Sequence, residues 1–436
     1  MKITLFKGIV FGVLSLSAIV GVFVFATHTG TTTNSATTVG TVVIWGTLPK
    51  ANVQNTLTAI AQTNTTLKDV SYVQKNLNTF PADLAAAIAT GNAPDLVLAS
   101  QEELHSLSKL IVPVPLATLP VSTFNTNFIE AGKIFSAPSG MGYYGIPFVV
   151  DPLVLFSNRS ILSSDGIAKP PATWEALTGL VPNVATFTPS KQVTRGLIAL
   201  GTYDNVHDAR AILSSLFFQT GVPMSAYANG SLSANLTGVA GTTGILPGKA
   251  VLDFYTQFAD PSKVSYTWNA SLPDSQQSFL NGDLALYLGY ASEARFLTAA
   301  NPNLDFAVSV LPQPATASFK STYALIYAFM IPRGAKNPSG AYQAVILLTS
   351  PAIQSSVASA LGLAPATLTP LATAPSDPVA AIAYAEALYS KGWLSPMPAD
   401  TDTVFSSMIT NVISGRFASD MAVTTSQNAL SSLLQK

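Results

Sequence analysis

Residues 79–98, TFPADLAAAIATGNAPDLVL, hold the connection that decides the fold class of this chain. The spacing of apolar residues over 79–90 predicts a helix, with Pro81 in its first turn, where the missing N–H has no helical partner to lose. Gly91 follows the helix end, where glycine adopts a positive φ without strain. Pro94 then restarts the chain, and residues 95–98 are a predicted strand. A helix that returns directly into a buried strand is typical of α/β proteins.

The same alternation extends to both sides of this stretch. Upstream, residues 41–45 and 70–73 are predicted strands on either side of a predicted helix over 52–63, and with the next strand they predict a right-handed βαβαβ layer. Further strands are predicted at 153–156, 197–200, 284–288 and 323–331, and further helices at 102–110, 173–180, 209–219, 251–258, 278–281, 339–350, 353–361, 380–390 and 404–413. The pattern predicts a mostly parallel sheet covered by helices.

The composition excludes several classes of protein. The 436 residues are 48% hydrophobic and 10% charged, and at about 150 residues per domain they are enough for two or three domains. With 21 basic and 22 acidic residues and no cluster of Lys or Arg, the chain lacks the surface that binds nucleic acid. Because it has no Cys, it has no disulfide, no thiolate metal site and no lipid-carrying cysteine.

The N-terminus is predicted to reach a membrane. Lys2 and Lys7 precede the uncharged, apolar run of residues 8–27, which is long enough to span the hydrocarbon core. The segment 1–27 is therefore either an uncleaved anchor or a secretory signal, with a cleavage site near Ala26. Residues 28–40 contain six Thr and predict a flexible linker. The rest of the chain is expected outside the cytoplasm, tethered or secreted.

Three phrases resemble the extracellular (type 1) solute-binding proteins of ABC importers, the family that includes maltose-binding protein. LAAAIATGNAPD at 84–95 resembles the family's helix, glycine turn and strand start. YGIPFVVDPLVLFSN at 144–158 resembles its crossover segment, and FLNGDLALYLG at 279–289 resembles a later helix and strand. The matches run in the family's order from Thr41 to the end. Asp283 and Leu286 depart from the usual Lys and Met.

The resemblance implies a fold in addition to the α/β class. It implies a two-lobed, periplasmic-binding-protein-like (type II) fold with a ligand cleft between the lobes, enclosed by hinge closure. The chain is expected to cross between the lobes near 149–153, 323–328 and 363–366. Lobe 1 then comprises 41–149 with 328–365, and lobe 2 comprises 150–327 with 366–436.

Candidate ligand-binding residues follow the ends of the predicted strands, since open α/β sheets bind ligands at the carboxyl ends of their strands. Trp45 and Thr47 end the first strand, where the ring can stack on a sugar face or pack in the core. Ser100, Gln101 and Glu102 follow the third strand, where the family commonly has polar sugar-binding groups. The alternative role of this turn is to cap the next helix.

The remaining candidates come mainly from the second lobe. The resemblance gives Asp151, in the first crossing, a carboxylate that reaches the ligand, and a hinge salt bridge is the alternative. Tyr203, with Asp204 and His207, lies in a loop that faces the cleft in this family, and Tyr290 and Ser292 follow another strand end. Phe405 occupies a position where the family often has a stacking aromatic ring, but its helical spacing with Met408 and Ile409 equally predicts core packing.

Searches for catalytic motifs were negative. The three His, at positions 28, 105 and 207, have no zinc-site spacing, and HExxH, GxSxG and P-loop motifs are absent. We therefore expect a monomeric binding protein without enzymatic activity, cofactor or metal, which captures a mono- or oligosaccharide and delivers it to ABC permease subunits. The alternatives are a receptor of the same fold for another small solute, such as a polyamine or glycerol phosphate, and a surface sensory or interaction protein without transport.

Overall fold

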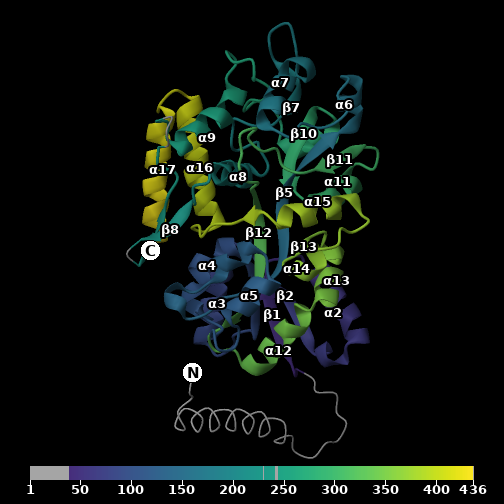
Figure 1. Cartoon of the computed structure of the whole chain (residues 1–436), viewed down its shortest axis with the longest axis vertical. Coiled ribbons are helices and arrows are strands. Elements are labelled where there is room, and N and C mark those ends of the chain that lie inside the picture. The colour runs from purple at the N-terminus through teal and green to yellow at the C-terminus, as the bar shows by residue number, and fades with distance from the viewer. Residues whose placement is uncertain (1–38, 229, 241–243, 436) are drawn as a thin grey trace, which may run out of the picture.

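Two groups of elements are joined by two long strands, β5 (Ile146–Asn158) and β12 (Thr322–Pro332), which run from one lobe into the other (Figure 1). The structure is a computed structural model and describes residues 39–228, 230–240 and 244–435. The expected N-terminal anchor and nearly all of the Thr-rich linker lie outside the described residues. Every residue of β5 is buried, as expected for a strand that lies in the middle of the molecule.

Lobe 1 is built on the predicted βαβαβ layer. Strand β1 (Val42–Gly46) pairs in parallel with β2 (Val70–Gln74) and with β3 (Leu96–Ser100), and short β4 (Ile111–Val112) pairs with β12. The helices of this lobe are α2 (Lys50–Thr63), α3 (Phe80–Ala89), α4 (Gln101–Leu107), α5 (Val121–Asn127), α12 (Pro338–Leu348), α13 (Pro351–Leu361) and α14 (Leu368–Leu371). Gly91 has a φ of 70°, which confirms the predicted glycine turn after α3.

Lobe 2 surrounds β10 (Leu284–Tyr290) and β7 (Val193–Ile198), which pair in parallel. Its other strands are β6 (Thr186–Phe187), β8 (Ser225–Ala228), β9 (Ser231–Ala234), β11 (Phe306–Ser309) and β14 (Ser390–Lys391). Its helices are α6 (Arg159–Ser164), α7 (Trp174–Val184), α8 (Ala209–Gln219), α9 (Pro247–Thr256), α10 (Ser275–Asn281), α11 (Glu293–Ala300), α15 (Pro378–Ala387), α16 (Pro398–Ile413) and α17 (Ser419–Leu434).

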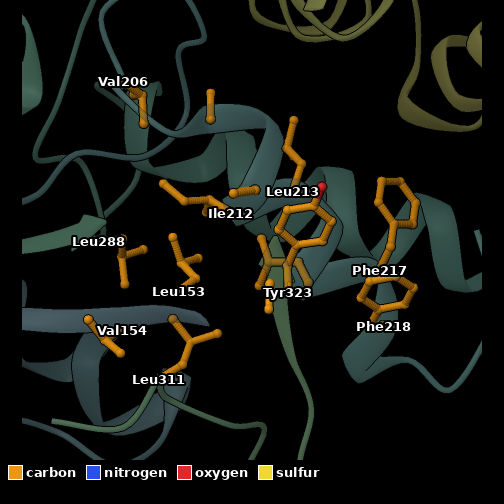
Figure 2. Packing of buried hydrophobic residues seen from close by; sticks show 14 of the residues in the cluster. Leu153, Val154, Val206, Ile212, Leu213, Phe217, Phe218, Leu288, Leu311 and Tyr323 are labelled. Atoms are coloured by element: carbon orange, nitrogen blue, oxygen red, sulfur yellow. The ribbon is translucent and has the colours of Figure 1, made fainter. Parts of the chain in front are cut away.

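The apolar helix α8 forms the centre of the lobe 2 core. Its Ile212 and Leu213 pack beside Leu153 of β5 and Tyr323 of β12 (Figure 2). All four side chains are at most 2% exposed. Because the crossing strands pack directly on α8, the position of this helix is coupled to the hinge.

The sheet order is β2-β1-β3-β12-β5-β10-β7-β6. The prediction of a mostly parallel sheet is wrong for the centre, where β12 runs antiparallel to β3 and to β5, and β5 runs antiparallel to β10. The reason is that a crossing strand which returns to the other lobe must reverse its direction. Parallel pairing is retained for β1 with β2 and β3 and for β7 with β10, where helices connect the strands, whereas β6, β8, β9 and β11 of lobe 2 pair antiparallel.

The three predicted crossing segments lie side by side. Val150 of β5 pairs with Ile326 of β12 and with Ala364 of β13 (Ala364–Pro365). This register agrees with crossings near 149–153, 323–328 and 363–366. We propose the lobe boundaries stated above except at the last crossing, because α14 follows it and still packs on α5 and α13 of lobe 1. Among the described residues, no single helix is long and apolar enough to cross a membrane. Helices α12 and α13, which are bent by 78° relative to each other, have that length and composition only when taken together.

Candidate ligand-binding cleft

A cavity of about 330 Å³ lies where strands and loops of lobe 2 end towards lobe 1. It is bordered by the loop between β7 and α8 with the start of α8, by the end of β10 and by Asp402 in the second turn of α16. The side chains that line it are mostly polar or aromatic: Tyr203, Asp204, His207, Asp208, Arg210, Tyr290 and Asp402. This position agrees with the rule that ligands of open α/β sheets bind beyond the carboxyl ends of the strands.

An ion pair connects this cavity to lobe 1. The Arg210 guanidinium near the start of α8 donates from Nε and Nη2 to the two carboxylate oxygens of Glu102, at 3.1 and 3.0 Å. Its Nη1 donates to Asp402 at 2.7 Å, and the Tyr203 hydroxyl donates to the same carboxylate at 2.6 Å. Burial, with Asp402 beside it, raises the pKa of Tyr203, so the phenol stays protonated. Glu102 therefore faces the second lobe, and Tyr203 lies in the same network.

The neighbours of Glu102 at the α4 N-terminus have structural contacts. Ser100 caps the helix, and Glu103 bonds back to its backbone N–H, which confirms the capping role predicted as the alternative for this turn. Gln101 is fully buried and forms two hydrogen bonds with the backbone of β12. Its Nε2 donates to the Ala324 carbonyl at 3.0 Å, and its Oε1 accepts from the Ile326 N–H at 2.7 Å. These bonds hold α4 against the crossing strand, so that Glu102 is presented to lobe 2.

Asp151 and Ser292, both predicted site residues, are in direct contact. Asp151 on β5 accepts hydrogen bonds from the Ser292 N–H at 3.1 Å and from its hydroxyl at 2.6 Å. Burial raises the pKa of the Asp151 carboxyl to about 7, although both hydrogen bonds from Ser292 act in the opposite direction. No Lys or Arg of the described chain lies within 4.0 Å of Asp151, so the predicted alternative of a hinge salt bridge does not describe this contact.

Three other candidates do not line the cavity. Trp45 is half-buried at the end of β1, with the Lys75 Nζ 3.5 Å from its ring centroid, and Thr47 donates to Glu103 at 3.3 Å. Phe405 is fully buried in the core of lobe 2, where its ring stacks on Trp393 with centroids 6.3 Å apart. Core packing, the alternative stated for Phe405, describes its position in this conformation.

Four charged residues of the region were not among the main sequence candidates. They are Arg210 and Asp402 in the ion-pair network, and Asp208 and Glu293 beside it. Burial and the neighbouring Glu293 raise the pKa of Asp208 well above its usual range. The lone Arg in the apolar helix predicted over 209–219 was the available signal, since an apolar helix has no other reason to bury a guanidinium.

Comparison with known proteins identifies the family. A family model described as bacterial extracellular solute-binding protein matches residues 57–385. The chain belongs to this family. A comparison with curated proteins finds no match. The family is extracellular, which implies a location outside the cytoplasm for this solute-binding protein.

Solved structures share the fold of this solute-binding protein over nearly its whole length. A cyclo/maltodextrin-binding protein complexed with maltotetraose is 16% identical with a TM-score of 0.72, and the match covers 93% of this chain and 99% of that one. The cyclic alpha-maltosyl-1,6-maltose binding protein from Arthrobacter globiformis is 15% identical with a TM-score of 0.73, covering 90% and 98%. The GacH receptor of Streptomyces glaucescens is 17% identical with a TM-score of 0.67, covering 91% and 98%. The predicted two-lobed fold is confirmed.

Proposed function

We propose that this solute-binding protein captures a mono- or oligosaccharide in the interlobe cleft and delivers it to the permease of an ABC transporter. The observation that carries the proposal is the cavity at the strand ends, where tyrosine rings lie beside carboxylates and a guanidinium. Sugar hydroxyls need donors and acceptors in fixed positions, and sugar ring faces pack on aromatic rings. Tyr203 and Tyr290 offer such rings, and Asp204 and Asp402 offer acceptors.

The relatives support a sugar as the ligand class. Two of the solved structures described above are named for maltodextrin or maltosyl-maltose binding, and the third is described in complex with acarbose. The contact of Glu102 with Arg210 supports hinge closure, since it joins lobe 1 to lobe 2 at the edge of the cavity. The same proposal includes delivery of the sugar to a permease, a monomeric state and tethering through residues 8–27. It includes no chemical reaction.

The test is a thermal-shift screen of the full-length chain against mono- and oligosaccharides, polyamines, glycerol phosphate and amino acids, followed by calorimetric titration of each hit. A ligand at about a hundred times its Kd stabilises the native state by about 2.7 kcal/mol, which moves the melting temperature measurably. We expect one sugar class to bind. Tyr290→Ala is expected to weaken that binding at least about tenfold, because it removes a ring from the cavity wall.

The matched control is Tyr227→Ala, which removes an exposed tyrosine of β8 outside this cavity and is expected to leave sugar binding unchanged. If a polyamine or glycerol phosphate raises the melting temperature and no sugar does, the protein is a receptor for that solute and the sugar proposal is wrong. A cooperative melt without any shift across the panel would favour a surface sensory or interaction protein.

A further inference from the structure

We infer that His207, Asp208 and Glu293 form a binding site for a divalent transition-metal ion, such as Zn²⁺ or Mn²⁺, at the lobe 2 side of the cleft. One ligand atom from each of the three side chains lies within 4.8 Å of the other two. Imidazole nitrogen together with carboxylate oxygen is a donor set that favours transition metals over Mg²⁺ and Ca²⁺. The inference goes beyond sugar capture and does not depend on it.

The fold brings these residues together from two places in the chain. His207 and Asp208 end the loop between β7 and α8, and Glu293 begins α11 directly after β10. Strands β7 and β10 are parallel neighbours, so that their carboxyl ends deliver both segments to the same edge of the sheet. Asp208 occupies the N-cap position of α8, yet its side chain does not cap the helix. Its carboxylate is therefore free to face Glu293.

The two carboxylates lack a cationic partner. Oδ2 of Asp208 is buried and has no hydrogen-bond partner in the described chain, and the Asp208 side chain lies against that of Glu293. Within the described residues, no Lys or Arg lies within 4.0 Å of either carboxylate, because Arg210 is engaged by Glu102 and Asp402. Asp208 and Glu293 are half-buried, and adjacent carboxylates out of bulk water repel each other unless a cation or a proton lies between them. The unpartnered Oδ2 indicates where the cation sits.

Glu293 is already held in the orientation that a metal ligand needs. Its Oε1 accepts from the Tyr290 N–H at 2.7 Å, and its Oε2 accepts from the Gln276 side chain at 2.6 Å and from the Tyr287 hydroxyl. Donors of this kind orient metal-binding carboxylates, and of the roughly four lone pairs of a carboxylate they leave one on Oε1 for the ion.

His207 completes the set and keeps it accessible. Its backbone N–H donates to the Ser275 hydroxyl at 2.9 Å, and its Nδ1 lies 3.6 Å from an oxygen of Asp274, the N-cap residue of α10, so the start of α10 positions it. The His207 side chain is 42% exposed, and with Asp208 it lines the cavity described above. With three protein ligands, the ion keeps an open coordination position towards the cavity, where an oxygen of a bound molecule can enter.

The experiment is calorimetric titration of the full-length, chelator-treated chain with ZnCl₂, MnCl₂, CaCl₂ and MgCl₂, without sugar. We expect one Zn²⁺ or Mn²⁺ per chain and much weaker binding of Ca²⁺ and Mg²⁺. Asp208→Asn and His207→Ala are each expected to weaken transition-metal binding at least about tenfold, and Tyr287→Phe to weaken it less, because it removes only one donor to Glu293. Asp305→Asn, an exposed acid of lobe 2, is the charge-matched control and is expected to change nothing.

Four outcomes would overturn the inference. The first is that no transition metal binds at a concentration of about 1 mM. The second is that Asp208→Asn and His207→Ala leave metal binding intact, and the third is that Asp305→Asn weakens it as much as they do. The fourth is that Ca²⁺ and Zn²⁺ bind with equal affinity and His207→Ala changes neither. Circular dichroism melts verify that each variant is folded. If Asp208→Asn does not fold, Glu293→Gln replaces it.

The Mn²⁺ electron paramagnetic resonance spectrum gives a second readout, since loss of an imidazole ligand in His207→Ala changes the nitrogen coupling. Because sugar is absent, failure here leaves the proposed sugar binding untouched.

Discussion

Glu102 and Arg210 face each other across the cleft in a two-point contact, with N···O distances of 3.1 and 3.0 Å. Glu102 lies in the first turn of α4 in lobe 1, and Arg210 lies in the first turn of α8 in lobe 2. The Glu102 side chain is 5% exposed and that of Arg210 is 19% exposed, so water screens this pair weakly. It is the ion pair through which the two lobes touch at the cavity edge.

Replacing Glu102 with Gln should destabilise the protein. The change leaves the buried guanidinium with Asp402 as its remaining carboxylate partner, and the loss of charge-assisted hydrogen bonds to the other partner costs about 2 kcal/mol. Urea unfolding measures the loss, and small-angle X-ray scattering measures whether the lobes separate. In Glu130→Gln the lost partner is Lys133 in an exposed pair, and we expect a change below about 0.5 kcal/mol. Equal losses in both variants would contradict the weight given to the interlobe pair.

Glu386 should make stability fall as pH rises. Its side chain is fully buried, and burial raises its pKa to about 8, despite the hydrogen bond from the Leu311 N–H at 2.7 Å. Between pH 4.5 and 8, the unfolded chain releases this proton while the native state retains it, so the free energy of unfolding falls with increasing pH. Glu386→Gln should flatten that slope over this range, as measured by urea unfolding at a series of pH values. Asp305→Asn should leave the slope as it is, and an unchanged slope in Glu386→Gln would refute the assignment.

Ser292→Ala should loosen the junction between β5 and the start of α11. The variant removes the 2.6 Å hydrogen bond to the Asp151 carboxyl and keeps the one from the backbone N–H. We expect a loss of about 1–2 kcal/mol in the free energy of unfolding, because the carboxyl oxygen is buried and has no substitute donor. Ser432→Ala, which removes a hydroxyl bonded to a carbonyl on an exposed helix face, is the matched control and should cost much less. Similar losses in the two serine variants would show that the Asp151 contact is not special.

Phe405→Ala should act on stability. The ring is 0% exposed and packs on Trp393, so its removal leaves a cavity that costs about 3–5 kcal/mol. Trp45→Ala, at a half-buried strand end, should cost less. Thermal and urea unfolding measure both changes. A stability loss in Phe405→Ala below that in Trp45→Ala would contradict the core position of Phe405 and revive a stacking role for its ring.

Several parts of the fold and of the site could be predicted from the sequence because their causes are local. Pro81 and Gly91 mark the two ends of α3, and the apolar run over 209–219 predicts α8 with both ends correct. Helix α17 was not predicted, since its apolar residues are diluted by Ser and Thr along its whole length. The metal site proposed above could not be predicted from spacing, because Glu293 is far from His207 in the chain.

The sequence by itself determined the alternation of strands and helices, the resemblance to the family and the strand ends at which the candidate side chains lie, since periodicity, glycine turns and capping act over a few residues. The tertiary structure decided which of those side chains meet. Glu102 meets Arg210 over a separation of 108 residues, and Asp151 meets Ser292 over 141. The register of β5 with β10 sets the second meeting, and the packing of α4 and α8 on β12 sets the first. Both depend on long-range packing that no local pattern contains.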